Sequence, residues 1–147
     1  MSKKTSKFVD KKQKIFTLSG KRKTAIAKAT IQEGNGKVTI NNKLLHSFNS
    51  FQQLSLKEPL ILAEEILGDA LKSVKIEIII HGGGSEGQIE AARLALARVL
   101  VAWFKEAGLK NKFLKYDRML LVADTRRKEM RKPNDSKARA ARQKSYR

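Results

Sequence analysis

The first patterned stretch of the chain is typical of two strands joined by a tight turn. Residues 25–31 read AIAKATI and predict a strand whose small side chains permit close packing on one side. Residues 33–36 read EGNG and supply a turn, because Asn-Gly is a strong short-range signal for a hairpin. Val38 and Ile40 alternate with polar residues, as expected for the returning strand.

The next stretch changes from helical to strand periodicity. Apolar residues between positions 48 and 71 recur at helical spacing, and we expect Pro59 to divide them into two helices because proline removes a backbone donor. Those apolar residues are Phe48, Phe51, Leu54, Leu60, Ala63, Ile66, Leu67 and Ala70. A strand is predicted next, with one face formed by Val74, Ile76, Ile78 and Ile80 and the other by Lys75, Glu77 and His81.

The longest predicted helix follows a glycine-rich loop. Ser85 and Gln88 have the spacing of a capping box, which predicts that the helix begins at Ser85. A shorter helix is expected at about residues 110–115, and the apolar run over residues 119–123 is expected to be the last piece tied to the core. The buried stripe predicted for the long helix holds Ile89, Ala92, Leu96, Val99, Leu100 and Trp103.

Charge divides the chain into three parts. Residues 1–30 hold ten basic residues and one acid, and residues 126–147 hold ten basic residues and two acids. Residues 31–125 are almost neutral, with twelve basic and eleven acidic side chains, so the two ends carry nearly all of the net charge of +18. A neutral middle with a basic extension at each end is the charge layout of a nucleic-acid-binding protein.

Length and composition narrow the classes further. One domain is expected for 147 residues, and we place it at residues 15–124, between a basic flexible arm (1–14) and an extended basic tail (125–147). The absence of cysteine excludes disulfides and thiolate sites, and two distant histidines make a zinc site hard to assemble. Without the apolar core of a secretory signal or a run long enough to span a membrane, the sequence predicts a soluble intracellular protein with no membrane partner.

The acidic residues form no catalytic constellation. Glu64 and Glu65 adjoin on a predicted helix and are interpreted as a solvated face. Asp117 and Asp124 are expected to pair with Arg118 and Arg126 rather than to catalyse a reaction. We therefore expect a protein that is not an enzyme, has no cofactor and takes no small-molecule substrate.

The glycine-rich loop allows more than one interpretation. Residues 82–87 satisfy GxGxxG between a strand and a helix, which is the context of a dinucleotide site. That site also needs an acid at the end of a second parallel strand about twenty residues on, and here the region near Gly108 is the end of a helix. We interpret the loop as a tight strand-to-helix turn, with an RNA phosphate at the helix amino terminus or a nucleotide cofactor as alternatives.

Two basic clusters are the candidate binding elements. Lys21, Arg22 and Lys23 precede a predicted strand, so we expect a fixed cluster beside a sheet edge; a solubilising strand end is the alternative. Six of the ten cations after residue 125 are arginines, whose planar fork suits phosphate oxygens, and Tyr146 could stack on a base. For this tail, a disordered solubilising extension or a localisation signal is the alternative.

The basic extensions and the glycine-rich loop also allow two other functions. A chromatin or DNA-compacting protein shares the basic extensions, and a preference for duplex DNA over folded RNA would identify it. A nucleotide-dependent enzyme would use residues 82–87, and saturable binding of a dinucleotide would identify it.

Six segments carry a family resemblance. They are GKRKTAIAKATI (20–31), GNGKVTIN (34–41), KEPL (57–60), GGGSEGQIEAARLALARVLV (82–101), YDRMLLVADTRRKE (116–129) and ARQKSYR (141–147). Together and in this order they closely resemble the small-subunit ribosomal protein S-nine family, in its archaeal and eukaryotic cytosolic form. Thr125 and residues 133–137 depart from the family pattern, which usually has a proline and a glycine-rich stretch at these two places.

The resemblance implies a small α+β domain with a mixed sheet, helices packed on one face and a left-handed βαβ crossover. It places the protein in cytoplasmic ribosomes, on ribosomal RNA of the small-subunit head and beside neighbouring small-subunit proteins, with a tail that approaches peptidyl-site tRNA. The residues it implies for ribosomal RNA are Lys21, Arg22, Lys23, Arg126, Arg127, Lys128, Arg131, Lys132, Arg139 and Arg142. Those it implies for the tRNA are Lys144, Ser145, Tyr146 and Arg147, with Arg147 as the phosphate contact.

Overall fold

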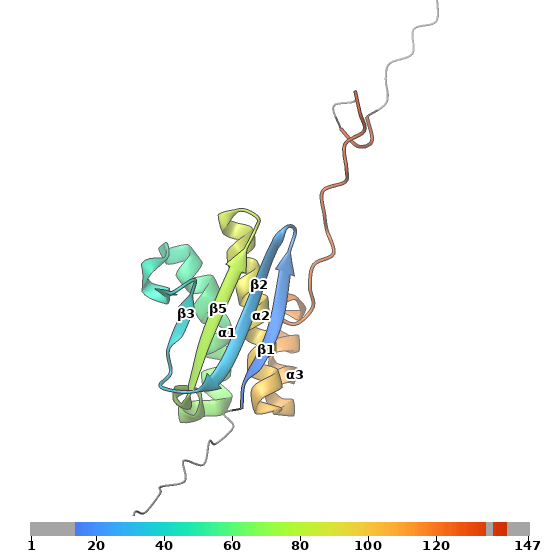
Figure 1. Cartoon of the computed structure of the whole chain (residues 1–147). Coiled ribbons are helices and arrows are strands. Elements are labelled where there is room, and N and C mark those ends of the chain that lie inside the picture. The colour runs from blue at the N-terminus through green and yellow to red at the C-terminus, as the bar shows by residue number, and fades with distance from the viewer. Residues whose placement is uncertain (1–13, 135–136, 141–147) are drawn as a thin grey trace, which may run out of the picture.

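One mixed sheet with helices on a single face forms the domain (Figure 1), in a computed structural model that describes residues 14–134 and 137–140. The α+β class predicted from the sequence is confirmed. The strands are β1 (Phe16–Arg22), β2 (Ala25–Glu33), β3 (Val38–Ile40), β4 (Lys43–Leu44) and β5 (Val74–His81). The helices are η1 (Leu45–Ser47), α1 (Ser50–Leu67), η2 (Gly68–Ser73), α2 (Ser85–Phe104), α3 (Ala107–Tyr116) and η3 (Arg118–Leu120), where η marks 3₁₀ turns.

The strand order, β1-β2-β5-β3-β4, corrects the predicted hairpin. β5 lies between β2 and β3, antiparallel to β2 and parallel to β3. The Asn-Gly turn exists, but its backbone pairs with β5: the Gly36 N–H donates to the Val74 carbonyl and the Ile76 N–H donates to the Lys37 carbonyl, each at 2.9 Å. β5 buries four β-branched residues, whereas β3 has only three residues in all. β5 is therefore favoured over β3 as the partner of β2 in the centre of the sheet.

The parallel pair requires a crossover, and α1 supplies it. Figure 1 shows the helices behind the sheet, with β3 and β5 running upward and β5 to the right of β3. The chain therefore passes to the right while crossing behind the sheet, which makes the β3–α1–β5 connection left-handed. This is the uncommon hand for such a connection, and it agrees with the prediction.

The core lies between the sheet and helices α1 and α2. Ala25, Ala27 and Ala29 of β2 are fully buried, and their small side chains bring α2 close to the sheet, as predicted. Gly20 of β1 is needed for the same reason, because a Cβ atom there would lie 2.3 Å from the carbonyl oxygen of Ala91. The opposite face of the sheet carries no helix in the part of the chain that the structure describes (Figure 1).

Two local predictions are corrected. Pro59 lies inside a continuous α1, and its ring is buried in the core, so packing offsets the lost backbone donor. The long helix begins at Ser85 as predicted, but Gly84 is its cap residue and no capping box forms. The Gln88 side chain instead donates to the Gly82 carbonyl oxygen at 3.1 Å.

Candidate nucleic-acid interface

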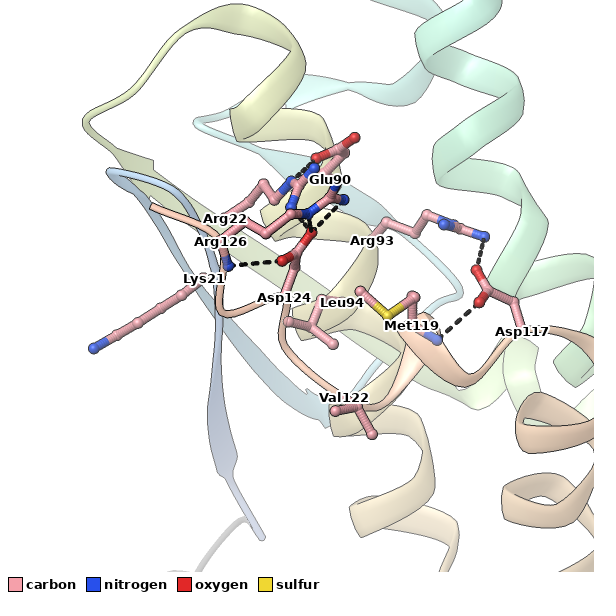
Figure 2. A pocket seen from close by; sticks show the side chains of 10 residues that line it. All are labelled: Lys21, Arg22, Glu90, Arg93, Leu94, Asp117, Met119, Val122, Asp124 and Arg126. Carbon is pink, nitrogen blue, oxygen red and sulfur yellow. Dashed lines mark hydrogen bonds and ion pairs between the residues drawn. The ribbon is translucent and has the colours of Figure 1, made fainter. Parts of the chain in front are cut away.

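An ionic cluster joins the domain to its basic tail (Figure 2). Arg22, the last residue of β1, contacts the carboxylates of both Asp124 and Glu90. Arg126 approaches the same Asp124 from the tail, with its Nε donating to Oδ2 at 2.8 Å and its backbone N–H donating to Oδ1 at 2.8 Å. Asp124 therefore fastens the first residues of the tail to the edge strand.

The carboxylate at this junction is held in its charged form. Hydrogen bonds from the Arg126 side chain and backbone, together with the cations Arg126 and Arg22, lower the pKa of Asp124 far below its usual range. The same pairing raises the pKa of Arg126. The predicted pairing of Asp124 with Arg126 is confirmed, and Arg22 is a second partner that the sequence did not indicate.

A second ionic cluster lies on the helical side of the junction (Figure 2). Arg93 of α2 contacts Glu58 of α1 at 2.5 Å and Asp117 at 3.1 Å, so the predicted pairing of Asp117 with Arg118 is wrong. The Glu58 carboxylate accepts a hydrogen bond from Tyr116 and raises the pKa of that phenol. Between the two clusters lies a hollow of about 230 Å³ lined by residues of both, with apolar walls from Leu94, Met119 and Val122.

Three lysines project from the sheet without facing the junction. Lys21 points away from the ionic cluster (Figure 2), and Lys23 occupies the β1–β2 turn with a positive φ of 52°. Lys28 lies on the helix-free face of β2, where strand pairing also brings His81 opposite Ile26. The sequence placed His81 on the polar face of its strand but did not indicate that Lys28 shares this face, because the pairing of β2 with β5 is not a local signal.

The described part of the tail is exposed and has no helix or strand over residues 125–134. The predicted cations Arg127, Lys128, Arg131 and Lys132 lie here, and Figure 1 shows this segment leading away from the domain. Arg139 lies farther along and forms a two-pronged hydrogen bond to Glu129, at 2.9 Å from Nε and 2.5 Å from Nη2. Arg139 lowers the pKa of Glu129, and the pKa of Arg139 itself is raised.

The glycine-rich loop is explained by packing. Gly82 and Gly83 have φ values of 73° and 70°, and added Cβ atoms would lie 2.7 Å from the Thr24 carbonyl oxygen and 2.8 Å from the Ala25 Cβ atom. The hollow beside the loop is lined by Glu86 and Glu90 as well as by basic residues. The interpretation as a tight strand-to-helix turn is confirmed, while a phosphate contact there is untested.

The remaining predicted contacts, Arg142, Lys144, Ser145, Tyr146 and Arg147, lie outside the described residues. Within residues 14–134 and 137–140, no group of three His, Asp or Glu side chains is placed to hold a metal ion. Over the same residues, no helix has the length and apolar character needed to cross a bilayer.

Comparison with known proteins identifies the family. Residues 20–147 match the family described as Ribosomal protein S9/S16. The chain belongs to the ribosomal protein S9/S16 family. It is 46% identical over 137 residues to the small ribosomal subunit protein uS9 of Methanococcus vannielii, covering 91% of this chain and 99% of that protein. The uS9 protein of Methanothrix thermoacetophila is 44% identical over 135 residues with the same coverage.

Membership of the S9/S16 family confirms the resemblance seen in the sequence. A ribosomal protein of this family is a structural component of the ribosome and not an enzyme, so the prediction against catalysis is confirmed by the family. Its location is the ribosome in the cytoplasm, as predicted. The ionic junction and the exposed cations are therefore features of a structural component of the ribosome.

Proposed function

We propose that this protein holds ribosomal RNA of the small-subunit head through its β1–β2 turn and its tail, and that its last residues support peptidyl-site tRNA. The observation that carries this proposal is the concentration of charge: residues 126–147 hold ten cations beside an almost neutral middle. Similarity to proteins named for the small ribosomal subunit supplies the setting. Neighbouring proteins of that subunit are the other partners.

The predicted cations divide into two roles. Arg22 and Arg126 share Asp124, so they position the start of the tail and their charge is partly neutralised within the protein. The exposed cations face solvent and are free to meet phosphates, with each contact releasing counterions and adding to the salt dependence of binding. This second group comprises Lys21, Lys23, Arg127, Lys128, Arg131 and Lys132, together with Lys28 on the helix-free face.

Arg139 and the terminal residues complete the proposed surface. The pairing of Arg139 with Glu129 is exposed, because the side chain of Arg139 is 85% accessible, and an RNA phosphate can replace the carboxylate. We assign Arg142 to ribosomal RNA on the resemblance alone. On the same ground, Lys144, Ser145, Tyr146 and Arg147 would reach the anticodon stem-loop, where a basic end and an aromatic ring suit phosphate and base.

Chemical footprinting of reconstituted small subunits tests both halves of the proposal. Subunits containing the full-length chain are compared with subunits containing a chain that ends at Gln143, each with and without peptidyl-site tRNA. We expect both forms to protect the same head RNA, because the exposed cations of the tail up to Lys132 are retained. Only the truncated form should weaken the tRNA footprint.

Two results would contradict the proposal at different points. If neither form protects ribosomal RNA, the assignment to the subunit head is wrong. If the truncated chain cannot enter subunits, the division between RNA anchoring and tRNA support is wrong. A duplex-DNA competitor serves as the control for a DNA-compacting function, and it should displace folded ribosomal RNA poorly.

A further inference from the structure

The helix-free face of the sheet is formed by alternate residues of β1, β2 and β5. On β2 and β5 the residues between them are buried against the helices, and all but Thr30 of those on the helix-free face are exposed. Strand pairing arranges them in three rows: Lys21, Ile26 and His81; Ser19, Lys28 and Ile79; and Thr17, Thr30 and Glu77. This face is therefore an open surface of the folded domain.

The charge of this face stays positive after its internal ion pairs are taken into account. The one acid in the three rows, Glu77, contacts Lys75 of the same strand, with Nζ and Oε1 2.5 Å apart. Within residues 14–134 and 137–140, Lys21 and Lys28 form no ion pair. The acids of α1 and α2 lie behind the sheet with their helices (Figure 1). The face therefore attracts an anionic partner.

The remaining polar side chains indicate which anion fits. Thr17, Ser19 and Thr30 supply hydroxyl groups, and the Oγ1 atoms of the two threonines lie 3.0 Å apart. The three rows contain no aromatic ring, and Phe16 packs edge-on against Trp103 of α2. Single-stranded RNA is held largely by stacking on aromatic rings, whereas base-paired RNA is held through phosphates and 2′-hydroxyls. Lysines and hydroxyls without rings therefore fit the backbone of base-paired RNA.

The apolar residues of this face do not favour a protein partner. Ile26 and Ile79 are 40% and 53% accessible, and strand pairing places His81 beside the first and Lys28 beside the second. Protein interfaces gather apolar residues at their centre and are depleted of lysine, whereas here cations and isoleucines alternate. A second copy of the same face would be repelled by its positive charge.

The turn that joins β1 to β2 also connects the two strands that carry the lysines. Lys23 lies in this turn, between Lys21 on β1 and Lys28 on β2. We propose that the helix-free face is a binding site for the sugar-phosphate backbone of base-paired RNA, with Lys21 and Lys28 contacting phosphates. Thr17 and Ser19 meet ribose hydroxyls. The source of the RNA rests on the proposed function, to which this site adds a surface built by three strands.

Directed hydroxyl-radical probing tests this site. The chain has no cysteine, so Ile79→Cys provides a single thiol on the face to which an iron chelate is attached. The full-length protein is then reconstituted into small subunits, and we expect cleavage of base-paired ribosomal RNA. Leu54→Cys is the control, because position 54 is exposed on α1 behind the sheet, and it should leave those nucleotides intact. Cleavage of unpaired RNA alone, or equal cleavage from position 54, would overturn the proposal.

A charge variant gives the quantitative test. The hairpin that is cleaved from position 79 is bound to the full-length chain in filter assays at several salt concentrations. Lys28→Gln should weaken binding about fivefold and make the slope of log affinity against log salt shallower by about 0.7–0.9, as for one lost phosphate contact. Lys57→Gln removes an exposed lysine from α1 and should leave the slope unchanged. A wild-type slope in Lys28→Gln would overturn the proposal.

A chelate on the tail separates this inference from the proposed function. Met130→Cys places it at a residue that is 90% accessible. RNA cleavage from position 130 without cleavage from position 79 would overturn the sheet-face site and leave the role of the tail standing. Cleavage from position 79 without cleavage from position 130 would overturn the role of the tail and leave the sheet-face site standing. Subunits that contain the protein and show neither cleavage would overturn both.

Discussion

The domain and the tail of this protein differ in the physical interaction that dominates each of them. Residues 16–124 bury an apolar core between a sheet and helices, and the charges of residues 31–125 are nearly balanced. The described tail residues have almost no buried surface and are dominated by cations. Burial of apolar surface stabilises the domain without a partner, whereas a concentrated positive charge gains free energy only when an anion neutralises it.

The two regions meet at Asp124, and the junction shows how they are connected. Arg22 on β1 belongs to the domain and Arg126 belongs to the tail, yet both contact the same carboxylate. The direction in which the tail leaves is therefore fixed by a side chain of the folded sheet. Changes in the domain should alter stability, changes in the tail should alter RNA affinity, and changes at the junction should alter both to a smaller degree.

Truncating the core should produce the largest loss of stability. Leu100 of α2 is fully buried, and Leu100→Ala should lower the free energy of unfolding by about 2–5 kcal/mol, because burial is lost and a cavity is left. Urea unfolding followed by circular dichroism measures the change. A chain ending at Gln143 is the control and should unfold at the wild-type urea concentration. Equal losses in both variants would contradict the separation of domain and tail.

Neutralising the tail should affect RNA binding and leave stability unchanged. We expect the combined change of Arg127, Lys128, Arg131 and Lys132 to glutamine to weaken binding of head RNA on the order of a hundredfold near physiological salt. The slope of log affinity against log salt should become shallower by about 0.7–0.9 for each lost phosphate contact. Filter binding at several salt concentrations measures both. A lower affinity with an unchanged slope would mean that these cations do not contact phosphates.

Sequence periodicity was sufficient for most of the elements. The alternation over β5 and the helical stripe of α2 are local signals, and both appear in the structure, with Ile89, Leu96 and Leu100 buried as predicted. The charge division between middle and ends is also local, so the candidate cations were visible before any fold was known. Family motifs supplied the crossover that periodicity alone does not encode.

The wrong predictions concern features that tertiary packing decides and local sequence does not. The Asn-Gly turn was recognised, but β3 pairs with β5 because strand partners are chosen over the whole sheet and not within one turn. Pro59 was expected to divide α1, yet its burial against the core outweighs the missing donor. The partnership of Arg22 with Asp124 joins residues 102 positions apart, and no short-range pattern reports such a pair.

An arginine inside the apolar run of α2 should contribute an intermediate amount of stability. Arg98 donates from Nε to the Leu121 carbonyl oxygen and from Nη1 to the Ser19 carbonyl oxygen, each at 2.9 Å. It thereby ties α2 to β1 and to the segment leading into the tail. Arg98→Met should cost about 1–3 kcal/mol, because carbonyl groups lose charged donors while the side-chain length is kept.

Urea unfolding again measures the effect of Arg98→Met. Arg118→Met serves as the control, since Arg118 is an exposed residue and should be replaceable with a change within about 0.5 kcal/mol. If Arg98→Met matched this control, the two carbonyl contacts would not contribute to stability.

The smallest expected effect lies at the junction and depends on pH. Asp124 has a lowered pKa in the folded protein and an ordinary value of 3.8, so its charged form is favoured by folding. Its contribution is fully present above about pH 5 and is lost as the pH falls through 3.8 toward the lower folded value. Asp124→Asn should therefore have a lower free energy of unfolding than wild type at pH 7. This difference should become smaller below about pH 4.

The control for this junction is an exposed carboxylate outside it. Asp69 pairs with Lys72 on the surface, with 90% of its side chain accessible, so Asp69→Asn should leave stability nearly unchanged at both pH values. A gap between wild type and Asp124→Asn that stays constant down to pH 3 would mean that shape, not charge, holds the tail at the sheet edge. If the difference disappears on acidification, the charge of Asp124 holds the basic tail at the edge of the stable domain.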